Sequence, residues 1–419
     1  MSLNKTRFSV NHQIKSNCTK GRNFMDSSRL YFSDEGILSS GGNITADDAA
    51  HIGRAASVLS GGIVVGIKAS PRSEMLAMSF CAAALEYGAD IFFAGDISLP
   101  ELFFMSKQAV GDCTVVYISS VFYPSFRFFR RGGGELSPAE EKLLEEDLFK
   151  NDTKRGCIGK FSDISSLRCL YVSHLKNIAR FGDDVSSYSV VINSPSERIR
   201  TLCSEVIPRF EGGETLAFHL NEDGVKVTAF TESTGYIQCG KLLMLALKYR
   251  LEEIDNIEVK TFKIPVRFPG FAEKIAAGYG VKIERSDTAE LDFYNDKIIL
   301  IVEILKIIQK TSQKMSILCS DLPEYAELDR YIPIEKESCE ERIKSLCSEY
   351  KNGKNYDPDK NFSGGVTIND GLGKISVTPI RSGKGIMLHA ESVKMESAAE
   401  LCNFYENILR SKGSFREKI

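Results

Sequence analysis

From about residue 45 onward, segments with helical spacing of apolar positions alternate with short runs of continuous apolar residues. Thr45 followed by Asp47 and Asp48 indicates a helix start, because a hydroxyl caps the first turn and acidic side chains favour the positive end of the helix dipole. The run 63–67 (Ile-Val-Val-Gly-Ile) predicts a buried strand. Strands separated by helices of this length indicate parallel βαβ units.

The same alternation extends over most of the chain and changes only near its C-terminal end. Further strands are predicted at 90–93, 113–118, 189–192, 214–218, 225–230 and 281–283, and helices at 73–87, 138–149, 196–206, 239–248, 271–277 and from about 296. Beyond these, Ser338 and Glu341 form a capping-box pattern for a helix to about residue 350. Strands at 366–369, 374–379 and 385–391 and a helix at 395–409 complete the pattern. The pattern predicts three α/β units followed by an α+β unit.

Composition narrows the class of protein. The chain has 419 residues, and its 53 basic and 56 acidic side chains give a net charge of −3. With 43% apolar and 26% charged residues it matches the globular average, which excludes disordered and coiled-coil classes. The near-neutral charge argues against nucleic acid and membrane surfaces as partners. The apolar stretches are too short to span a bilayer and no secretory signal opens the chain, so we expect a cytoplasmic protein.

The eleven cysteines are spread along the chain without a Cys-x-x-Cys pair. A dispersed, odd number fits neither a disulfide framework nor a zinc ribbon. We therefore expect free thiols, most of them buried.

Several strings occur in an order and spacing that resemble one known family. They are 46–56, 63–66 (Ile-Val-Val-Gly), 99–102 (Leu-Pro-Glu-Leu), 126–129 (Phe-Arg-Phe-Phe) with 133–136, and 216–218 leading into 240–243. Together they make the chain, from about residue 30, similar to the α-D-phosphohexomutases: phosphoglucomutase, phosphomannomutase and phosphoglucosamine mutase. The resemblance implies an α/β fold of three α/β domains with mixed sheets and a C-terminal α+β domain around a central cleft. The implied domains are 1–152, 153–252, 253–328 and 329–419.

The resemblance also implies a nucleophile loop, and here that loop departs from the family. Active members carry a phosphoserine in a Thr-Ala-Ser-His-Asn-Pro loop, where this chain has Ser-Ser-Val-Phe-Tyr-Pro at 119–124. Alignment on the strand puts Ser120 at the nucleophile position, whereas alignment on Pro124 puts Val121 there and leaves no hydroxyl. A family lysine falls on Arg130 or Arg131, and arginine is a poor proton shuttle because it stays protonated. Both a structural and a phosphorylated Ser120 remain open.

The metal loop departs in the same way. Active members have Asp-Gly-Asp-Ala-Asp-Arg, and this chain has His-Leu-Asn-Glu-Asp-Gly at 219–224. The implied ligand positions are His219, Asn221 and Asp223, so the formal charge falls from −3 to −1. Magnesium prefers anionic oxygen ligands, which leaves either a solvated polar turn or a site for a softer divalent ion.

Two further functional sites of the family are altered or missing in this sequence. A third, the phosphate loop, is retained but is shifted along the sequence. The Asp-Gly-Ile-Arg string appears as Glu-Gly-Ile-Leu at 35–38, and the sugar-recognition loop of the third domain has no counterpart. Where the family has its C-terminal phosphate loop, this chain has Arg381, Ser382, Gly383 and Lys384. Two cations, a hydroxyl and a flexible glycine can form an anion site, and an exposed basic turn is the alternative.

These departures lead to two hypotheses. The first is a member of impaired or lost catalytic activity, a pseudoenzyme without a bound cofactor, which binds a sugar phosphate or a protein partner such as an active homologue. The alternative is an active phosphomannomutase- or phosphoglucomutase-type intramolecular phosphotransferase. That enzyme would use phospho-Ser120, Arg130, a divalent metal such as Mg²⁺ and a hexose 1,6-bisphosphate.

Overall fold

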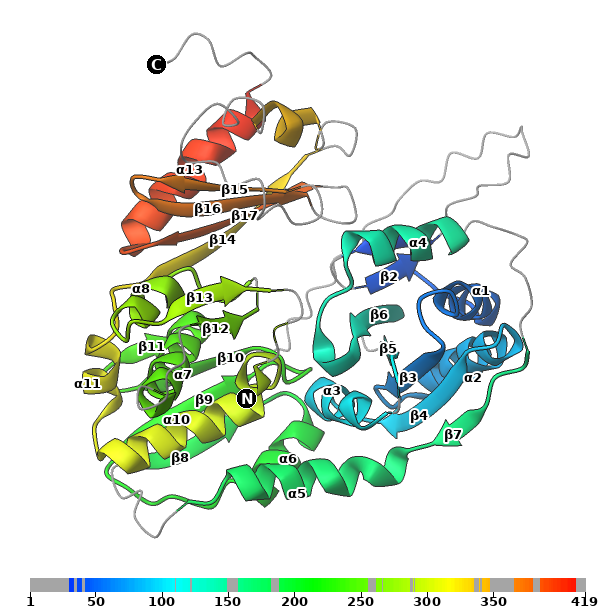
Figure 1. Ribbon diagram of the computed structural model, residues 1–419, viewed down its shortest axis with the longest axis horizontal. Coiled ribbons are helices and arrows are strands. Elements are labelled where there is room, and N and C mark those ends of the chain that lie inside the picture. The colour runs from blue at the N-terminus through cyan, green and yellow to red at the C-terminus, as the bar shows by residue number, and fades with distance from the viewer. Residues whose placement is uncertain are drawn as a thin grey trace, which may run out of the picture.

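The structure is a computed structural model of the chain. It describes residues 30–33, 36–39, 42–109, 111–120, 123–148, 157–181, 188–254, 261–265, 267–286, 289, 291–334, 339, 341–346, 365–379 and 385–411. Four sheets organise these residues, and we call the parts built on them the first to fourth units, in chain order. In Figure 1 the first unit lies at the right, the second and third at the left, and the fourth above them.

The first unit is a seven-stranded mixed sheet with helices on both faces. Its strands, in the order β1-β2-β6-β5-β3-β4-β7, are β1 Leu30–Ser33, β2 Gly36–Ser39, β3 Gly62–Ile67, β4 Asp90–Asp96, β5 Thr114–Ser119, β6 Ser125–Arg130 and β7 Phe161–Asp163. Its helices are α1 Ala46–Ala56, α2 Pro71–Glu86, α3 Leu99–Gln108, η1 Arg131–Gly133, α4 Pro138–Leu148 and η2 Ser165–Leu167. Ile63, Val65 and Ile67 pack with α1 and α2, while Val64 packs with α3. The continuous apolar run of β3 is therefore buried on both faces, as predicted.

The second unit has a four-stranded sheet in the order β11-β10-β9-β8. Its elements are α5 Arg168–Ile178, β8 Tyr188–Asn193, α6 Glu197–Val206, β9 Glu214–Leu220, β10 Val227–Thr231, β11 Gly235–Ile237 and α7 Cys239–Ile254. β8 and β9 are parallel, and β9, β10 and β11 are antiparallel. Leu216, Phe218 and Leu220 are buried in the core, but the residues between them are not.

The third unit is small and shares its core with the second. Its elements are β12 Thr261–Ile264, α8 Ala272–Ala277, β13 Lys282–Arg285, α9 Asp292–Asn295, α10 Lys297–Thr311 and α11 Met315–Ser320. The apolar side chains of α10 pack in the same cluster as those of α7. Within the described residues this unit's sheet is one parallel pair rather than the mixed sheet that the resemblance implied.

The fourth unit is an antiparallel sheet covered by a helix. Its strands, in the order β14-β17-β16-β15, are β14 Ala326–Pro333, β15 Val366–Asp370, β16 Gly373–Pro379 and β17 Gly385–Ser392. Helix α13, Met395–Arg410, packs on it through Leu401 and Tyr405. The predicted α/β fold class, with a C-terminal α+β unit, is confirmed.

The predicted domain boundaries remain predictions. Two of them, 252/253 and 328/329, fall inside α7 and β14. The cysteines within the described residues are free thiols, and most are buried. None of the helices in the described residues combines the length and apolar character that a membrane span requires.

Candidate functional site

Ser120 lies directly after β5, at the N-terminal end of α2. Its Oγ is 2.6 Å from the Oγ of Ser70 and 2.9 Å from the Oγ of Ser73. Ser70 is the N-cap of α2 and accepts a hydrogen bond from the Ser73 backbone N–H at 3.0 Å, and Ser73 is fully buried. Within the described part of the chain, these two hydroxyls are the hydrogen-bond partners of Ser120. Neither partner is a histidine or a carboxylate, so neither can act as the base that a serine nucleophile requires.

Arg130 lies at the other end of the strand pair from Ser120. β5 and β6 are antiparallel, with Thr114 opposite Arg130 and Ser119 opposite Ser125. The Arg130 guanidinium pairs with Glu140 at 2.9 Å, near the start of α4. The structure therefore does not bring Ser120 and Arg130 together, because the two ends of a six-residue strand are roughly 17 Å apart.

The turn that matches the family's metal loop is held together by Asn221. Its Oδ1 accepts hydrogen bonds from the backbone N–H groups of Val225 and Lys226, both at 2.9 Å. Gly224 has a φ of +77° and approaches Pro100 of the first unit, so a side chain there would be strained. The Asn221 amide oxygen thus stabilises the turn instead of facing a metal.

The other two predicted ligand residues do not face a shared metal position either. His219 is exposed on β9, opposite Thr228 of β10. Asp223 pairs with Arg127 of β6, with 2.8 Å between Nη1 and Oδ2. The structure does not gather His219, Asn221 and Asp223 around one point.

The neighbouring acid of the turn, Glu222, pairs with Lys68, whose ammonium is buried after β3. Both acids of the turn are thus neutralised by cations of the first unit. Among the described residues no group of three His, Cys, Asp or Glu side chains is placed to hold a metal ion. The residues present do not fit the magnesium ion that the resemblance implies.

A second set of ion pairs centres on Glu101 of α3, which has no solvent exposure. Its carboxylate accepts from Arg168 of α5 at 2.9 Å and from Arg198 of α6 at 2.7 Å, and it caps α3 together with Ser98. Burial acts to raise the pKa of Glu101, but hydrogen bonds from Arg198 and Ser98 outweigh it and the pKa is lowered. Arg198 also reaches Asp96 at 3.2 Å. We call the ion pairs of Lys68, Arg127, Arg168 and Arg198 the junction between the first and second units.

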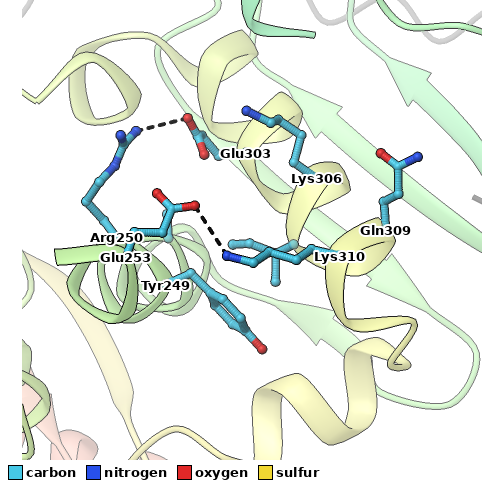
Figure 2. Close-up of a pocket in the computed structure, with 9 residues that line it drawn as sticks. Tyr249, Arg250, Glu253, Glu303, Lys306, Gln309 and Lys310 are labelled. Carbon is cyan, nitrogen blue, oxygen red and sulfur yellow. Dashed lines mark hydrogen bonds and ion pairs between the residues drawn. The ribbon is translucent and has the colours of Figure 1, made fainter. Parts of the chain in front are cut away.

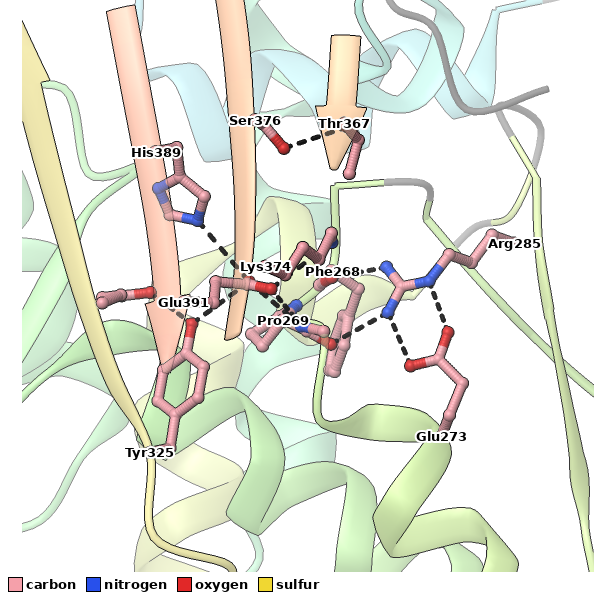
Figure 3. A network of polar contacts seen from close by, with 12 residues as sticks. Phe268, Pro269, Glu273, Arg285, Tyr325, Thr367, Lys374, Ser376, His389 and Glu391 are labelled. Atoms are coloured by element: carbon pink, nitrogen blue, oxygen red, sulfur yellow. Dashed lines mark hydrogen bonds and ion pairs between the residues drawn. The ribbon is translucent and has the colours of Figure 1, made fainter. Parts of the chain in front are cut away.

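The fourth unit meets the third around another buried carboxylate, Glu391 of β17 (Figure 3). Its two oxygens accept from the Gly270 backbone N–H at 3.0 and 3.1 Å. Lys374 Nζ, His389 Nε2 and the Tyr325 hydroxyl lie 3.3, 3.5 and 3.3 Å from it. Burial opposes ionisation, but His389 and Lys374 lower the pKa of Glu391 to about 2. We call this cluster the Glu391 joint.

A groove of about 340 Å³ lies between α7 and α10 (Figure 2). Two ion pairs cross it, Arg250 with Glu303 at 3.0 Å and Lys310 with Glu253 at 3.5 Å. None of the predicted site residues lines it. The groove therefore belongs to the packing of the two helices rather than to the junction.

Four predicted phosphate-binding residues fall outside the described residues: Arg381, Ser382, Gly383 and Lys384. Conversely, Lys68 and Arg127 pair with the acids of the turn, although neither was predicted as a functional residue. A signal for Arg127 exists, because it lies within the string 126–129 (Phe-Arg-Phe-Phe) that carries part of the resemblance. Lys68 gives a weaker signal, since it is the first charged residue after a buried strand.

Comparisons with known proteins agree with the fold. No family model matches the chain. Phosphoglucosamine mutase from Dictyoglomus turgidum is 21% identical over 364 residues, which cover 70% of this chain and 81% of that protein. Phosphoglucosamine mutase from Dictyoglomus thermophilum is 22% identical over 213 residues, which cover 48% and 46%.

Two solved structures share the fold at low sequence identity. A phosphoglucomutase/phosphomannomutase family protein from Burkholderia thailandensis has a TM-score of 0.67 at 12% identity, with 92% of this chain and 97% of that chain covered. The phosphoglucomutase parafusin from Paramecium has a TM-score of 0.51 at 10% identity, with 87% and 91% covered. The resemblance stated from the sequence is thus confirmed: the chain has the fold of the α-D-phosphohexomutases.

Proposed function

We propose that this protein is a phosphohexomutase-type protein of impaired phosphoryl transfer that binds a sugar phosphate. The observation that carries the proposal is the junction, where Lys68 and Arg127 neutralise Glu222 and Asp223. By the resemblance, Asp223 stands at a position that holds magnesium beside the phosphoserine, and Glu222 is the neighbouring acid of the same turn. Here protein cations occupy the surroundings of both carboxylates.

The charges of the turn support this proposal. Glu222 and Asp223 supply two negative charges, and Lys68 and Arg127 supply two positive charges at contact distance. A divalent cation approaching either carboxylate would meet a guanidinium or ammonium group within a few ångströms. At an effective dielectric constant of about 20, a unit charge 4 Å from a divalent ion repels it by about 8 kcal/mol. Metal binding would therefore require the ion pairs to break first.

The surroundings of Ser120 point in the same direction. Phosphoryl transfer needs a nucleophile that is both placed and activated. Ser120 shares hydrogen bonds with Ser70 and Ser73, and Arg130 lies at the far end of the strand pair. The hydroxyl is placed at a helix N-terminus, and its hydrogen-bond partners in the described residues are two serines rather than a base. Such a position suits the binding of a phosphate group better than phosphoryl transfer to the serine.

An assay of mutase activity tests the catalytic half of the proposal. Purified protein is incubated with glucosamine 6-phosphate, glucose 1-phosphate or mannose 1-phosphate, together with Mg²⁺ and glucose 1,6-bisphosphate. We expect no turnover above that of the Ser120→Ala variant, and no phosphoryl group on Ser120 in the intact mass. Turnover that Ser120→Ala abolishes, or a phosphorylated Ser120, would restore the alternative of an active mutase.

Thermal-shift titration tests the binding half. We expect hexose phosphates to raise the melting temperature and unphosphorylated hexoses to leave it unchanged. Arg381→Ala should remove the shift, whereas Arg209→Ala, which alters an exposed arginine paired with exposed Glu211, should keep it. Absence of any shift with the wild type would contradict sugar-phosphate binding and favour a protein partner such as an active homologue.

A further inference from the structure

Three hydrogen-bond donors form a row on one face of the first sheet, where β3, β5 and β6 lie side by side. The registers place Gly66 beside Tyr117 and Tyr117 beside Arg127. Lys68 follows β3, and its backbone N–H donates to the Ile118 carbonyl of β5 at 2.9 Å. Since successive side chains alternate between the two faces of a strand, Lys68 is on the same face as Gly66 and therefore as Tyr117. We call Lys68, Tyr117 and Arg127 the donor row.

The donor row has hydrogen-bonding capacity that the protein does not use. The Lys68 ammonium is buried and pairs with Glu222, but it makes no hydrogen bond of regular geometry within the described residues. Tyr117 is 3% exposed, and its hydroxyl has no hydrogen-bond partner in the same part of the chain. Burial, together with the charges of Asp223 and Asp96, raises the pKa of Tyr117, so the hydroxyl keeps its proton and can donate. Nearly all buried donors in proteins are satisfied, so two such donors on adjacent strands indicate an acceptor from outside the chain.

The acids of the turn 219–224 neutralise the two cations of the donor row. Glu222 pairs with Lys68, and Asp223 pairs with Arg127 at 2.8 Å. The two acids are consecutive residues, whose Cα atoms are about 3.8 Å apart, so the turn gathers both cations at one place. A phosphate group carries about −1.5 to −2 charges near pH 7 and has three acceptor oxygens. One phosphate group therefore matches the charge of both carboxylates and the donors of the row.

The two acidic side chains can leave the row without unfolding the turn. Those of Glu222 and Asp223 are 34% and 28% exposed, so each can rotate into water. The turn itself is held by the Asn221 side chain, which accepts from the backbone N–H groups of Val225 and Lys226. A phosphate group can therefore replace the carboxylates at the donor row while the backbone of the turn keeps its shape.

From these observations we propose that the donor row is a phosphate-binding site, closed by an autoinhibitory contact with Glu222 and Asp223. In the closed state the two carboxylates supply the negative charge that a phosphate group would supply. The ligand is a phosphate group, carried by inorganic phosphate or by a hexose phosphate. The inference rests on the ion pairs that carry the proposed function, but it does not depend on Arg381. Because the row is closed in the wild type, Arg381→Ala alone should still remove the thermal shift by hexose phosphates.

Isothermal titration calorimetry in an Arg381→Ala background tests the proposal, because this background lacks the arginine on which the proposed function depends. The titrants are inorganic phosphate and glucose 6-phosphate. Adding Glu222→Gln and Asp223→Asn should lower the dissociation constant for inorganic phosphate roughly tenfold or more, because two like charges no longer compete with it. Adding Lys68→Met to that protein should abolish the gain. A gain with inorganic phosphate alone assigns the row to free phosphate, and an equal or larger gain with glucose 6-phosphate assigns it to phosphate esters.

The matched control combines Glu211→Gln with Glu232→Gln in the same background, since these two exposed acids belong to the second unit but lie outside the turn. It should leave both dissociation constants unchanged. An equal gain in the control would overturn the proposal, because net charge alone would then set the affinity. Absence of a gain in the folded Glu222→Gln/Asp223→Asn protein would overturn it as well.

The single variants keep the proposal testable if the double variant does not fold. Glu222→Gln and Asp223→Asn each leave one ion pair of the turn in place, and each should lower the dissociation constant for inorganic phosphate roughly threefold. If neither does so, the donor row is not a closed phosphate site. That result would leave the proposed function standing, because its tests use the chain with Arg381 intact.

Discussion

The junction between the first and second units and the Glu391 joint between the third and fourth are built on the same plan with different cations. Each centres on a carboxylate with almost no exposure, Glu101 in one case and Glu391 in the other. Glu101 is paired with two guanidinium groups, which stay charged at every accessible pH. Glu391 is paired with an ammonium and an imidazole. The comparison teaches that two joints of similar geometry differ in their response to pH.

Removal of either central carboxylate should have the largest effect on stability. Glu101→Gln removes one counter-charge from Arg168 and Arg198, and Glu391→Gln removes one from Lys374 and His389. Asp96 still pairs with Arg198, and Asp329 still pairs with His389. We expect each substitution to lower the free energy of unfolding by about 2–3 kcal/mol, because the partly exposed cations can regain some hydration. Urea denaturation measures the loss. Asp96→Asn, at a half-exposed carboxylate of the same junction, is the control and should cost about 0.5 kcal/mol.

A third buried carboxylate, Asp296, sharpens the comparison because no cation of the described residues donates a hydrogen bond to it. It accepts from the Tyr171 hydroxyl at 2.6 Å and from the first N–H groups of α10. Burial raises the pKa of Asp296 to about 6. The folded state therefore holds a proton that the unfolded state has released, and stability falls as the pH rises from about 4 to above 6.

The Asp296→Asn variant should lack this pH-dependent loss of stability, because an amide does not ionise. The amide oxygen can still cap the helix. We expect it to be about 1–2 kcal/mol more stable than the wild type at pH 8, and to lose this advantage at pH 4. Thermal denaturation at the two pH values checks the result. Equal differences at both pH values would show that Asp296 is ionised throughout and would contradict the assignment.

The imidazole of the Glu391 joint should make a smaller contribution to the pH dependence of stability. Here it is the charged form of the buried group, not the neutral form, that stabilises the fold. Burial opposes protonation, but hydrogen bonds to Asp329 and Glu391 raise the pKa of His389 to about 10. Its contribution to stability is therefore complete below pH 6.5 and is lost as the pH rises toward 10. The ring is 37% exposed, so solvent screening limits the loss to about 1 kcal/mol.

The His389→Gln variant should be less stable than the wild type at pH 6, and the difference should shrink by pH 10. Stability curves of both proteins over this range measure it. Glu101→Gln should run parallel to the wild type, since its partners do not titrate. If the two variants show the same pH dependence, the two joints do not differ as described.

Arg130 gives the smallest predicted effect. Its ion pair with Glu140 is about one-third exposed on each side, which is typical of pairs worth at most about 1 kcal/mol. Arg130→Ala should lower the melting temperature slightly and leave the thermal shift by hexose phosphates intact. Loss of that shift would instead return Arg130 to the candidate site.

Continuous and alternating apolar runs predicted most elements correctly. The run 63–67 predicted β3, and 214–218 predicted β9, because burial on one or two faces leaves a direct trace in the sequence. The strand Ser125–Arg130 was not predicted as a strand, since its two arginines and serine disturb the pattern. Local patterns thus identify elements that bury apolar side chains and miss those that carry charges.

The candidate site could be located from the sequence, but its contacts could not be predicted. The resemblance brought Ser120 and the turn 219–224 to attention. The pairing of Arg127 with Asp223 joins residues 96 positions apart, and no local pattern encodes which cation meets which acid. The role of Arg130 stays a prediction, because the count from Pro124 that assigns it assumes a loop of constant length.

Titration with Mg²⁺ tests the central claim most directly, namely that Lys68 and Arg127 neutralise the acids of the turn in place of a metal ion. Isothermal titration calorimetry of the wild type should show no saturable Mg²⁺ binding at millimolar concentrations. The Asp223→Asn variant should behave in the same way. Binding of one Mg²⁺ per chain by the wild type, abolished by Asp223→Asn, would contradict the account.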